Sequence, residues 1–258
     1  MQSGTDLLEK AIEAHGGLAL WQSVGEVRAK VSGGGFGFAA KFQGRALHRV
    51  VRGGVAAGDD GEVRVCTTTP KTILAPYPGP GRRGVFEADS VRIESADGQV
   101  LAERRNPRAA FRDFRHYLWW DHLDLLYFRG YALWNYLNAP FLLLRPGIEY
   151  REVPPWDEKG ERWRRLAVTF PPDVPTHSRE QVFYFDAAGL LRRLDYTAEP
   201  FGSYAKSANY AWQHQTFSGL VVPTRRKVLL RKPSGRPRPW PTLVWIKLDQ
   251  VTLGTRRN

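Results

Sequence analysis

The chain is poor in sulfur, with one cysteine and one methionine among 258 residues. A single cysteine, Cys66, excludes an intramolecular disulfide and any metal site built from several thiolates. The first ten residues also lack the basic segment and the apolar run of a secretory signal peptide. We therefore expect a cytoplasmic protein, or a periplasmic or exported one if a leader has been removed.

Motifs for cofactors and nucleic acids are also missing. The sequence has no phosphate-binding loop, no dinucleotide glycine fingerprint and no GxSxG elbow, so we expect neither a cofactor nor a conventional serine hydrolase. The net charge is +12, but the basic residues stand in small groups beside turns, as on solvated strands. We expect no nucleic-acid partner. An anionic membrane surface is an alternative partner for this charge.

Strand-like segments and turn residues alternate along most of the chain. The expected strands are Val27–Val31, Gly35–Phe42, Ala46–Val51, Glu62–Thr68, Val91–Ser95, Val100–Arg105, Ile148–Val153, Trp163–Phe170, Gln181–Phe185, Leu190–Thr197, Asn209–Phe217, Val221–Leu230 and Leu243–Leu248. Regular spacing of this kind is typical of an antiparallel meander. A helix over Thr5–Ala14 precedes it and ends at Gly16-Gly17. We expect one mainly β domain over residues 1–258.

The segment Trp119–Leu144 is almost continuously aromatic or aliphatic. Arg129 and the polar or helix-breaking residues near it argue against a membrane span. We expect a buried helix with one polar stripe that faces either water or a cavity. Gly130 offers a point at which the helix could split, and Pro140 bends or ends it. The stripe consists of Asp121, Asp124, Asn135 and Asn138.

The histidines and carboxylates allow acid–base chemistry but form no metal motif. His116, His122 and the neighbouring aspartates lack the spacing of a metal site, so no metal is expected. The candidate catalytic residues are Asp124, His177, Asp195 and His214, which could act as general acids and bases if their strands adjoin. A structural hydrogen-bonding role is the alternative for each histidine.

The N-terminal helix ends in His15-Gly16-Gly17, and Trp21 follows four residues later. This HGGxxxW pattern, with consecutive strands and an embedded helix, resembles the outer-membrane lipoprotein carriers of the LolA/LolB-like superfamily, which also includes mycobacterial lipid-binding lipoproteins. The resemblance implies a curved antiparallel half-barrel. It also implies a helical plug over about residues 106–145, with an apolar cavity for acyl chains between plug and sheet.

These observations predict a binding protein for a lipophilic molecule such as a lipid, an acyl chain, a terpenoid or a polyketide. The expected ligand contacts are Trp119, Trp120, Asp121, Tyr127, Tyr131, Trp134, Tyr210 and Trp212. Aromatic rings suit this role because they supply contact area at low entropic cost. The alternative is an enzyme, a cyclase, isomerase or hydrolytic enzyme, that uses the same cavity.

Overall fold

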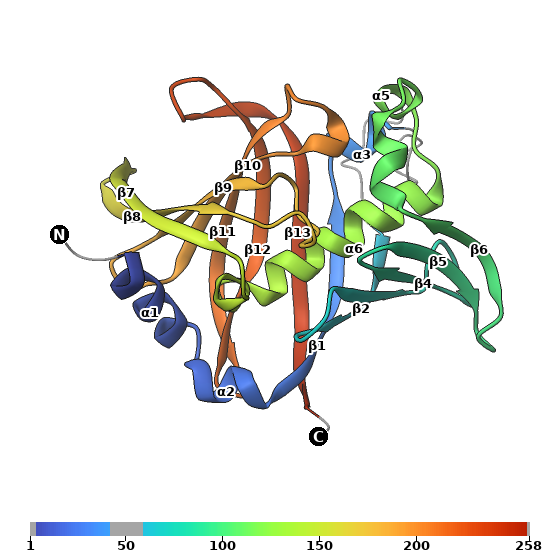
Figure 1. The fold of residues 1–258 in the computed structure, drawn as a ribbon, viewed down its shortest axis with the longest axis horizontal. Coiled ribbons are helices and arrows are strands. Elements are labelled where there is room, and N and C mark those ends of the chain that lie inside the picture. Colours follow the sequence, from blue (N-terminus) through green and yellow to red (C-terminus); the bar gives the residue numbers. More distant parts are fainter. Residues whose placement is uncertain (1–3, 42–58, 257–258) are drawn as a thin grey trace.

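The computed structural model describes residues 4–41 and 59–256. They form an open, curved antiparallel sheet of thirteen strands in the order β6-β5-β4-β3-β2-β1-β13-β12-β11-β10-β9-β8-β7 (Figure 1). The strands are β1 (Val24–Gly34), β2 (Asp59–Cys66), β3 (Lys71–Ala75), β4 (Arg82–Glu87), β5 (Ser90–Ser95), β6 (Val100–Arg105), β7 (Glu149–Glu158), β8 (Glu161–Thr169), β9 (Glu180–Phe185), β10 (Leu191–Thr197), β11 (Lys206–Phe217), β12 (Leu220–Arg231) and β13 (Pro237–Thr255). The predicted half-barrel is confirmed.

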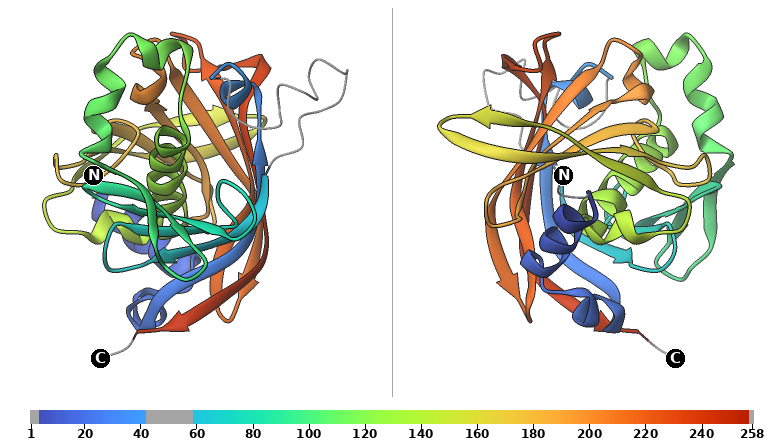
Figure 2. Two further views of the ribbon diagram at one scale, coloured as in Figure 1. Left: turned by 90° about the vertical axis from the view of Figure 1, so that its right-hand side faces the viewer. Right: turned by 60° about the vertical axis from the view of Figure 1, so that its left-hand side comes forward.

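The strand order explains why the middle of the chain crosses the sheet. Two meanders, β1–β6 and β7–β13, meet where β1 pairs with β13. Their other ends, β6 and β7, are the two edges of the sheet, and the connecting segment must run from one edge to the other. It does so inside the curve of the sheet (Figure 2). Its elements are η1 (Pro107–Arg112), α5 (Arg115–Leu118), α6 (His122–Asn138) and η2 (Phe141–Leu144).

Helix α6 is the main element of this plug. Asp121 caps its N-terminus by accepting from the backbone N–H of Asp124, and the Asp124 carboxylate accepts from Asp121 in return. The helix ends at Asn138, two residues before Pro140, which cannot donate a helical hydrogen bond. No helix in the described part of the chain has the length and apolarity needed to cross a membrane.

Gly130 does not split α6, which continues through it. A Cβ atom at this position would lie 2.3 Å from Cβ of Phe86 on β4, closer than side chains pack. The glycine therefore lets the helix backbone approach the sheet.

Three of the four residues of the polar stripe face neither water nor the cavity, and the fourth, the helix cap Asp121, is partly exposed. Asp124, Asn135 and Asn138 are buried. Asn135 donates to the carbonyl oxygens of Tyr131 and Pro175, and Asn138 donates within the helix to Trp134. These amides thus satisfy backbone groups around the plug, as buried polar groups must.

The N-terminal motif ties helix α1 (Gly4–Ala14) to the sheet. The His15 imidazole Nδ1 donates to Ala11, Nε2 accepts from the backbone of Leu191 on β10, and the His15 carbonyl accepts from Val221 on β12. A Cβ atom at Gly16 would lie 2.6 Å from the carbonyl oxygen of Gly219. The motif is therefore a docking joint, and α2 (Leu18–Ser23) leads from it into β1.

Two local predictions differ from the structure. Residues 36–39 of the expected strand Gly35–Phe42 form helix α3 (Phe36–Ala39), because Gly35 has a φ of 136° and turns the chain. Phe42 and the expected strand Ala46–Val51 lie outside the described residues. Strands β3 and β4 were not predicted from the sequence. In β4 the apolar pattern is hidden by Gly84, where a Cβ atom would lie 2.5 Å from a methyl group of Leu126.

Candidate functional site

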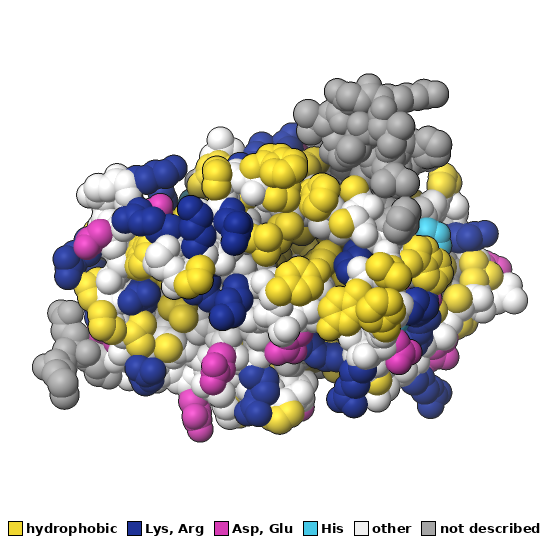
Figure 3. Space-filling view, turned by 90° about the horizontal axis from the view of Figure 1, so that it is seen from above, with side chains coloured by type: hydrophobic (Ala, Val, Ile, Leu, Met, Phe, Trp, Pro, Cys, Tyr) yellow, Lys and Arg dark blue, Asp and Glu magenta, His cyan; other side chains and the backbone are white. Residues whose placement is uncertain are grey.

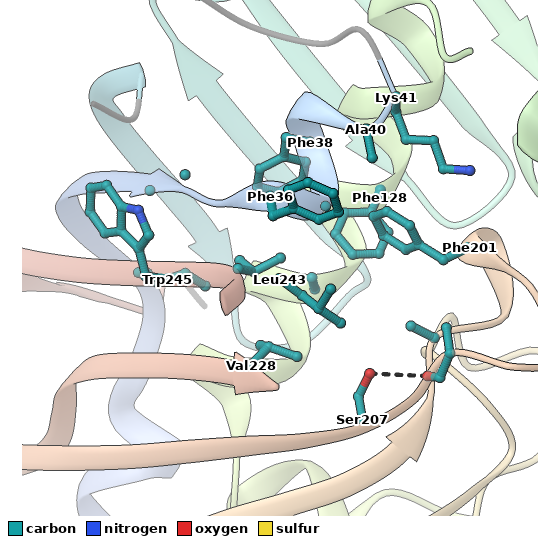
Figure 4. A pocket seen from close by; sticks show the side chains of 18 of the residues that line it. Phe36, Phe38, Ala40, Lys41, Phe128, Phe201, Ser207, Val228, Leu243 and Trp245 are labelled. Atoms are coloured by element: carbon teal, nitrogen blue, oxygen red, sulfur yellow. Dashed lines mark hydrogen bonds between the residues drawn. The ribbon is translucent and has the colours of Figure 1, made fainter. Parts of the chain in front are cut away.

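A cavity of about 410 Å³ lies between α6 and the sheet. Its sheet wall comes from β1 and β10–β13, while α3 and the short helix η3 (Glu199–Phe201) add Phe36, Phe38 and Phe201 (Figure 4). The lining is mostly apolar, and in the described part of the chain it contains no Asp, Glu, His or Cys. This size and character suit a single small ligand.

One face of α6 forms the plug side of the cavity. The lining residues of the helix are Leu125, Phe128, Arg129, Ala132, Leu133 and Tyr136. They recur at intervals of three and four, which is the spacing of neighbours on one helical face. The plug is therefore both a core element, through its other faces, and a cavity wall.

Exposed aromatic side chains surround the mouth of the cavity. Tyr117 is 47% exposed, Phe36 is 49%, Tyr204 is 65% and Trp240 is 75%, and all four belong to the lining. The view from above shows hydrophobic side chains gathered around a hollow (Figure 3). Apolar patches of this kind mark binding sites for ligands, proteins or membranes.

Lys41 is the buried cation of the cavity wall. Its ammonium donates to the carbonyl oxygens of His116 at 2.8 Å and Tyr117 at 2.7 Å. It also lies within 6 Å of the ring centres of Tyr117, Trp120 and Phe201. Burial lowers the pKa of Lys41 to about 8.

Tyr136 and Tyr196, which line the cavity, belong to a buried hydrogen-bond network with His177. The Tyr136 hydroxyl contacts Nε2 of His177 at 2.7 Å and the Tyr196 hydroxyl at 2.8 Å, and the Tyr131 hydroxyl contacts Nδ1 of His177 at 3.0 Å. Burial holds the pKa of His177 well below its usual value and raises that of Tyr136 to about 12. Both imidazole nitrogens are occupied, so His177 is a neutral structural group.

The predicted catalytic residues occupy separate environments. Asp124 bonds Arg104 and His116 at the start of α6. Asp195 on β10 accepts from Arg193 and from the Tyr184 hydroxyl.

His214 on β11 occupies a third environment, beside the backbone of Leu191. Its Nε2 lies 3.1 Å from the Leu191 carbonyl oxygen, and burial lowers its pKa to about 4. Adjacent strands did not bring His177, Asp195 and His214 together. His177 lies in the loop before β9, and Asp195 pairs in register with Ala208, six residues along β11 from His214. None of the four predicted catalytic residues lines the cavity.

The eight expected ligand contacts are not part of the cavity wall either. Four of them, Trp120, Tyr127, Tyr131 and Trp134, are fully buried in the core around the plug. The Trp134 indole, for example, donates to the carbonyl of Cys66 on β2.

The other four lie at or near the surface. Asp121 pairs with Arg104, Trp119 is 43% exposed beneath the Arg115 guanidinium, Tyr210 bonds Glu158 and Arg193, and Trp212 is 36% exposed. The cavity instead meets the helix on the face that includes Phe128 and Ala132.

Sequence analysis missed Lys41 and the phenylalanines of the wall. Phe36, Gly37 and Phe38 follow a glycine run and fall within the expected strand Gly35–Phe42. The helical repeat from Leu125 to Tyr136 carried a usable signal. Every face of α6 is apolar, however, so periodicity alone did not distinguish the cavity face from the core faces.

No protein-family model and no curated protein sequence matches the chain. Solved structures match its fold. A LolA superfamily protein from Nitrosomonas europaea superposes with a TM-score of 0.51 at 10% identity, over 98% of this chain and 94% of its own. A DUF1329 family protein from Desulfovibrio piger gives 0.52 at 11%, over 96% and 92%. A Vibrio parahaemolyticus domain assigned to outer membrane lipoprotein sorting gives 0.52 at 9%, over 97% and 92%. The chain therefore has the LolA-like fold.

Proposed function

We propose that this chain, with its LolA-like fold, binds one lipophilic small molecule in the cavity between α6 and the sheet. The observation that carries the proposal is the apolar cavity of about 410 Å³, walled by the plug on one side and strands on the other. Its volume lies toward the lower end of the roughly 300–1,000 Å³ of small-molecule sites. The assignment of a structural neighbour to lipoprotein sorting agrees with a lipophilic ligand.

Binding is favoured over catalysis by the chemistry of the wall. A cyclase, isomerase or hydrolytic enzyme needs a group that can exchange protons with its substrate. The wall offers Lys41, Arg129, Ser207 and tyrosine hydroxyls, and among the described residues it has no carboxylate or imidazole. The Ser207 hydroxyl donates to the Ala205 carbonyl (Figure 4).

The test fills the cavity and measures ligand content. Ala132→Trp places an indole into the space from α6, and Ala187→Trp makes the same exchange at an exposed position in the turn before β10. Native mass spectrometry and solvent extraction give the lipophilic molecule bound per chain. A fluorescent fatty acid titrated into stripped protein gives the affinity.

We expect Ala132→Trp to abolish binding and Ala187→Trp to leave it unchanged. If Ala132→Trp fails to fold, Val228→Phe fills the same space from β12. Equal binding by a folded cavity-filled variant and the wild type would refute the proposal.

A further inference from the structure

The charged side chains among the described residues of the cavity wall are all basic. Lys41 and Arg129 line it, and none of the described lining residues is acidic. Lys41 is the more informative of the two, because it is only 2% exposed and none of the described carboxylates forms an ion pair with it. A buried cation without a counter-ion costs free energy that an anion at the same place would recover.

Among the described residues, the Lys41 ammonium has two hydrogen-bond acceptors, which leaves one donor for a ligand. An ammonium carries three N–H donors, and two of them go to the carbonyl oxygens of His116 and Tyr117. Those acceptors are neutral and leave the positive charge uncompensated. The rings of Trp120 and Phe201 lie 5.7 and 5.5 Å from Nζ and restrict its access to water.

On this geometry we propose that the ligand is a single-tailed amphiphile with an anionic head group, a carboxylate or a phosphate. The head group pairs with the Lys41 ammonium, and the tail lies along the apolar wall formed by Phe128 and Leu133 of α6 and by β12 and β13. This inference rests on the proposed function and specifies its ligand class. The cavity volume of about 410 Å³ agrees with one tail.

A purely structural role for Lys41 makes a different prediction. The ammonium contacts two carbonyls of α5, so it also holds that helix against the wall. Loss of this contact would disturb the cavity for every ligand alike. Loss of a head-group partner would weaken anionic ligands and spare a neutral molecule with the same tail.

The experiment compares palmitate, palmitoyl lysophosphatidic acid and hexadecanol on stripped full-length protein, by displacement of a neutral fluorescent lipid. The variants are Lys41→Met, Lys41→Arg, which keeps the charge, and Lys206→Met, which removes an exposed lysine of β11 that does not line the cavity. Acetate and inorganic phosphate test the head groups without tails.

We expect Lys41→Met to weaken at least one anionic ligand roughly tenfold to a hundredfold, the range of a charge-assisted hydrogen bond. Hexadecanol should change by less than about threefold, well under one such bond, and Lys41→Arg and Lys206→Met should resemble the wild type. Which anion responds identifies the head group. Equal loss of all three ligands, or no loss, overturns the inference while the lipophilic site stands. If the wild type binds neither the probe nor any of the tailed molecules, the proposed function fails as well.

Discussion

The indole of Trp21 stacks on the ring of Phe141, with centroids 4.3 Å apart and planes 6° from parallel. Trp21 belongs to the N-terminal HGGxxxW pattern, and Phe141 opens η2 just after α6. The pair therefore joins the start of the chain to the far end of the plug. Both residues are buried.

This contact predicts that either truncation destabilises the fold. Trp21→Ala and Phe141→Ala should each lower the free energy of unfolding by about 3–5 kcal/mol. In the double variant the losses should fall short of additivity by about 0.5–1.5 kcal/mol, the coupling of an aromatic pair. Urea denaturation measures both quantities. Trp240→Ala, at a 75% exposed ring, is the control, and full additivity would contradict the coupling.

A second prediction concerns the approach of α6 to the sheet. Gly130→Ala should destabilise the protein by about 1–3 kcal/mol, because the new methyl group collides with Phe86. Helix propensity alone would predict a gain of about 1 kcal/mol from the same exchange. Urea denaturation and near-ultraviolet circular dichroism follow the change, and a stabilised variant would disprove the close contact.

Acid should weaken the fold through its buried histidines. Burial lowers the pKa of His15 and of His214 to about 4, whereas in the unfolded chain each takes up a proton near pH 6.5. Between these values the unfolded state binds more protons, so stability falls as the pH drops from 6.5 towards 4.

Each of these histidines contributes at most about 1.4 kcal/mol per pH unit. Unfolding free energies at pH 7, 6 and 5 test this. Hydrogen bonds from Lys71 and Arg92 lower the pKa of Glu87, so protonation of this carboxylate reduces the stability only below about pH 4.5, outside the tested range. His214→Phe should flatten the slope, and an unchanged slope would exclude His214 as a source.

The proposed head-group site predicts an opposite pH dependence for ligand binding. With a pKa of about 8, free Lys41 is charged at pH 7 and loses its proton as the pH rises through 8. A bound anion favours the charged form, so palmitate affinity should be constant from pH 6.5 to 7.5. It should then fall by up to about tenfold per pH unit above 8.

Two controls separate Lys41 from other titrations. Tyr117 is the titratable ring beside the ammonium, so Tyr117→Phe removes it without touching the charge of Lys41. Lys41→Arg, which stays protonated, should remove the fall in affinity. Displacement titrations from pH 6.5 to 9.5 measure the profile, and the same fall in Lys41→Arg would assign it to another group.

The exposed aromatic mouth predicts a role in ligand uptake from membranes. Phe36→Ser and Trp240→Ser remove exposed rings 6.2 Å apart at the cavity mouth. We expect both to slow transfer of a fluorescent fatty acid from anionic vesicles while equilibrium affinity changes little. Trp212→Ser, at a partly exposed ring outside the cavity, is the control. Equal transfer rates for all variants would contradict this role.

The sequence predicts the fold better than it predicts the site. The Asp97-Gly98 dipeptide between the expected strands Val91–Ser95 and Val100–Arg105 is a strong hairpin signal, and in the structure it joins β5 to β6 with a positive φ of 90° at Gly98. Apolar density identified the plug. The face of α6 that lines the cavity was not predictable. It depends on the curvature of the sheet, which leaves space beside Ala132 but packs tightly against Gly130.

The expected grouping of His177, Asp195 and His214 depended on strand register, which the sequence does not give. β10 and β11 do adjoin, but Asp195 pairs with Ala208 and not with a residue next to His214. Lys41 gave no signal at all, since its two acceptor carbonyls lie 75 and 76 residues away along the chain.

The pairing of β1 with β13 determines when the cavity wall is completed during folding. β13 provides Leu243, Val244, Trp245 and Ile246 of the wall. One of its two neighbours in the sheet, β1, lies near the opposite end of the described chain. Contacts between such distant segments are slow to form, so this seam should be among the last parts of the fold to close. Until it closes, the part of the wall that β1 and β13 form together is incomplete, and a ligand of the proposed kind has no complete site.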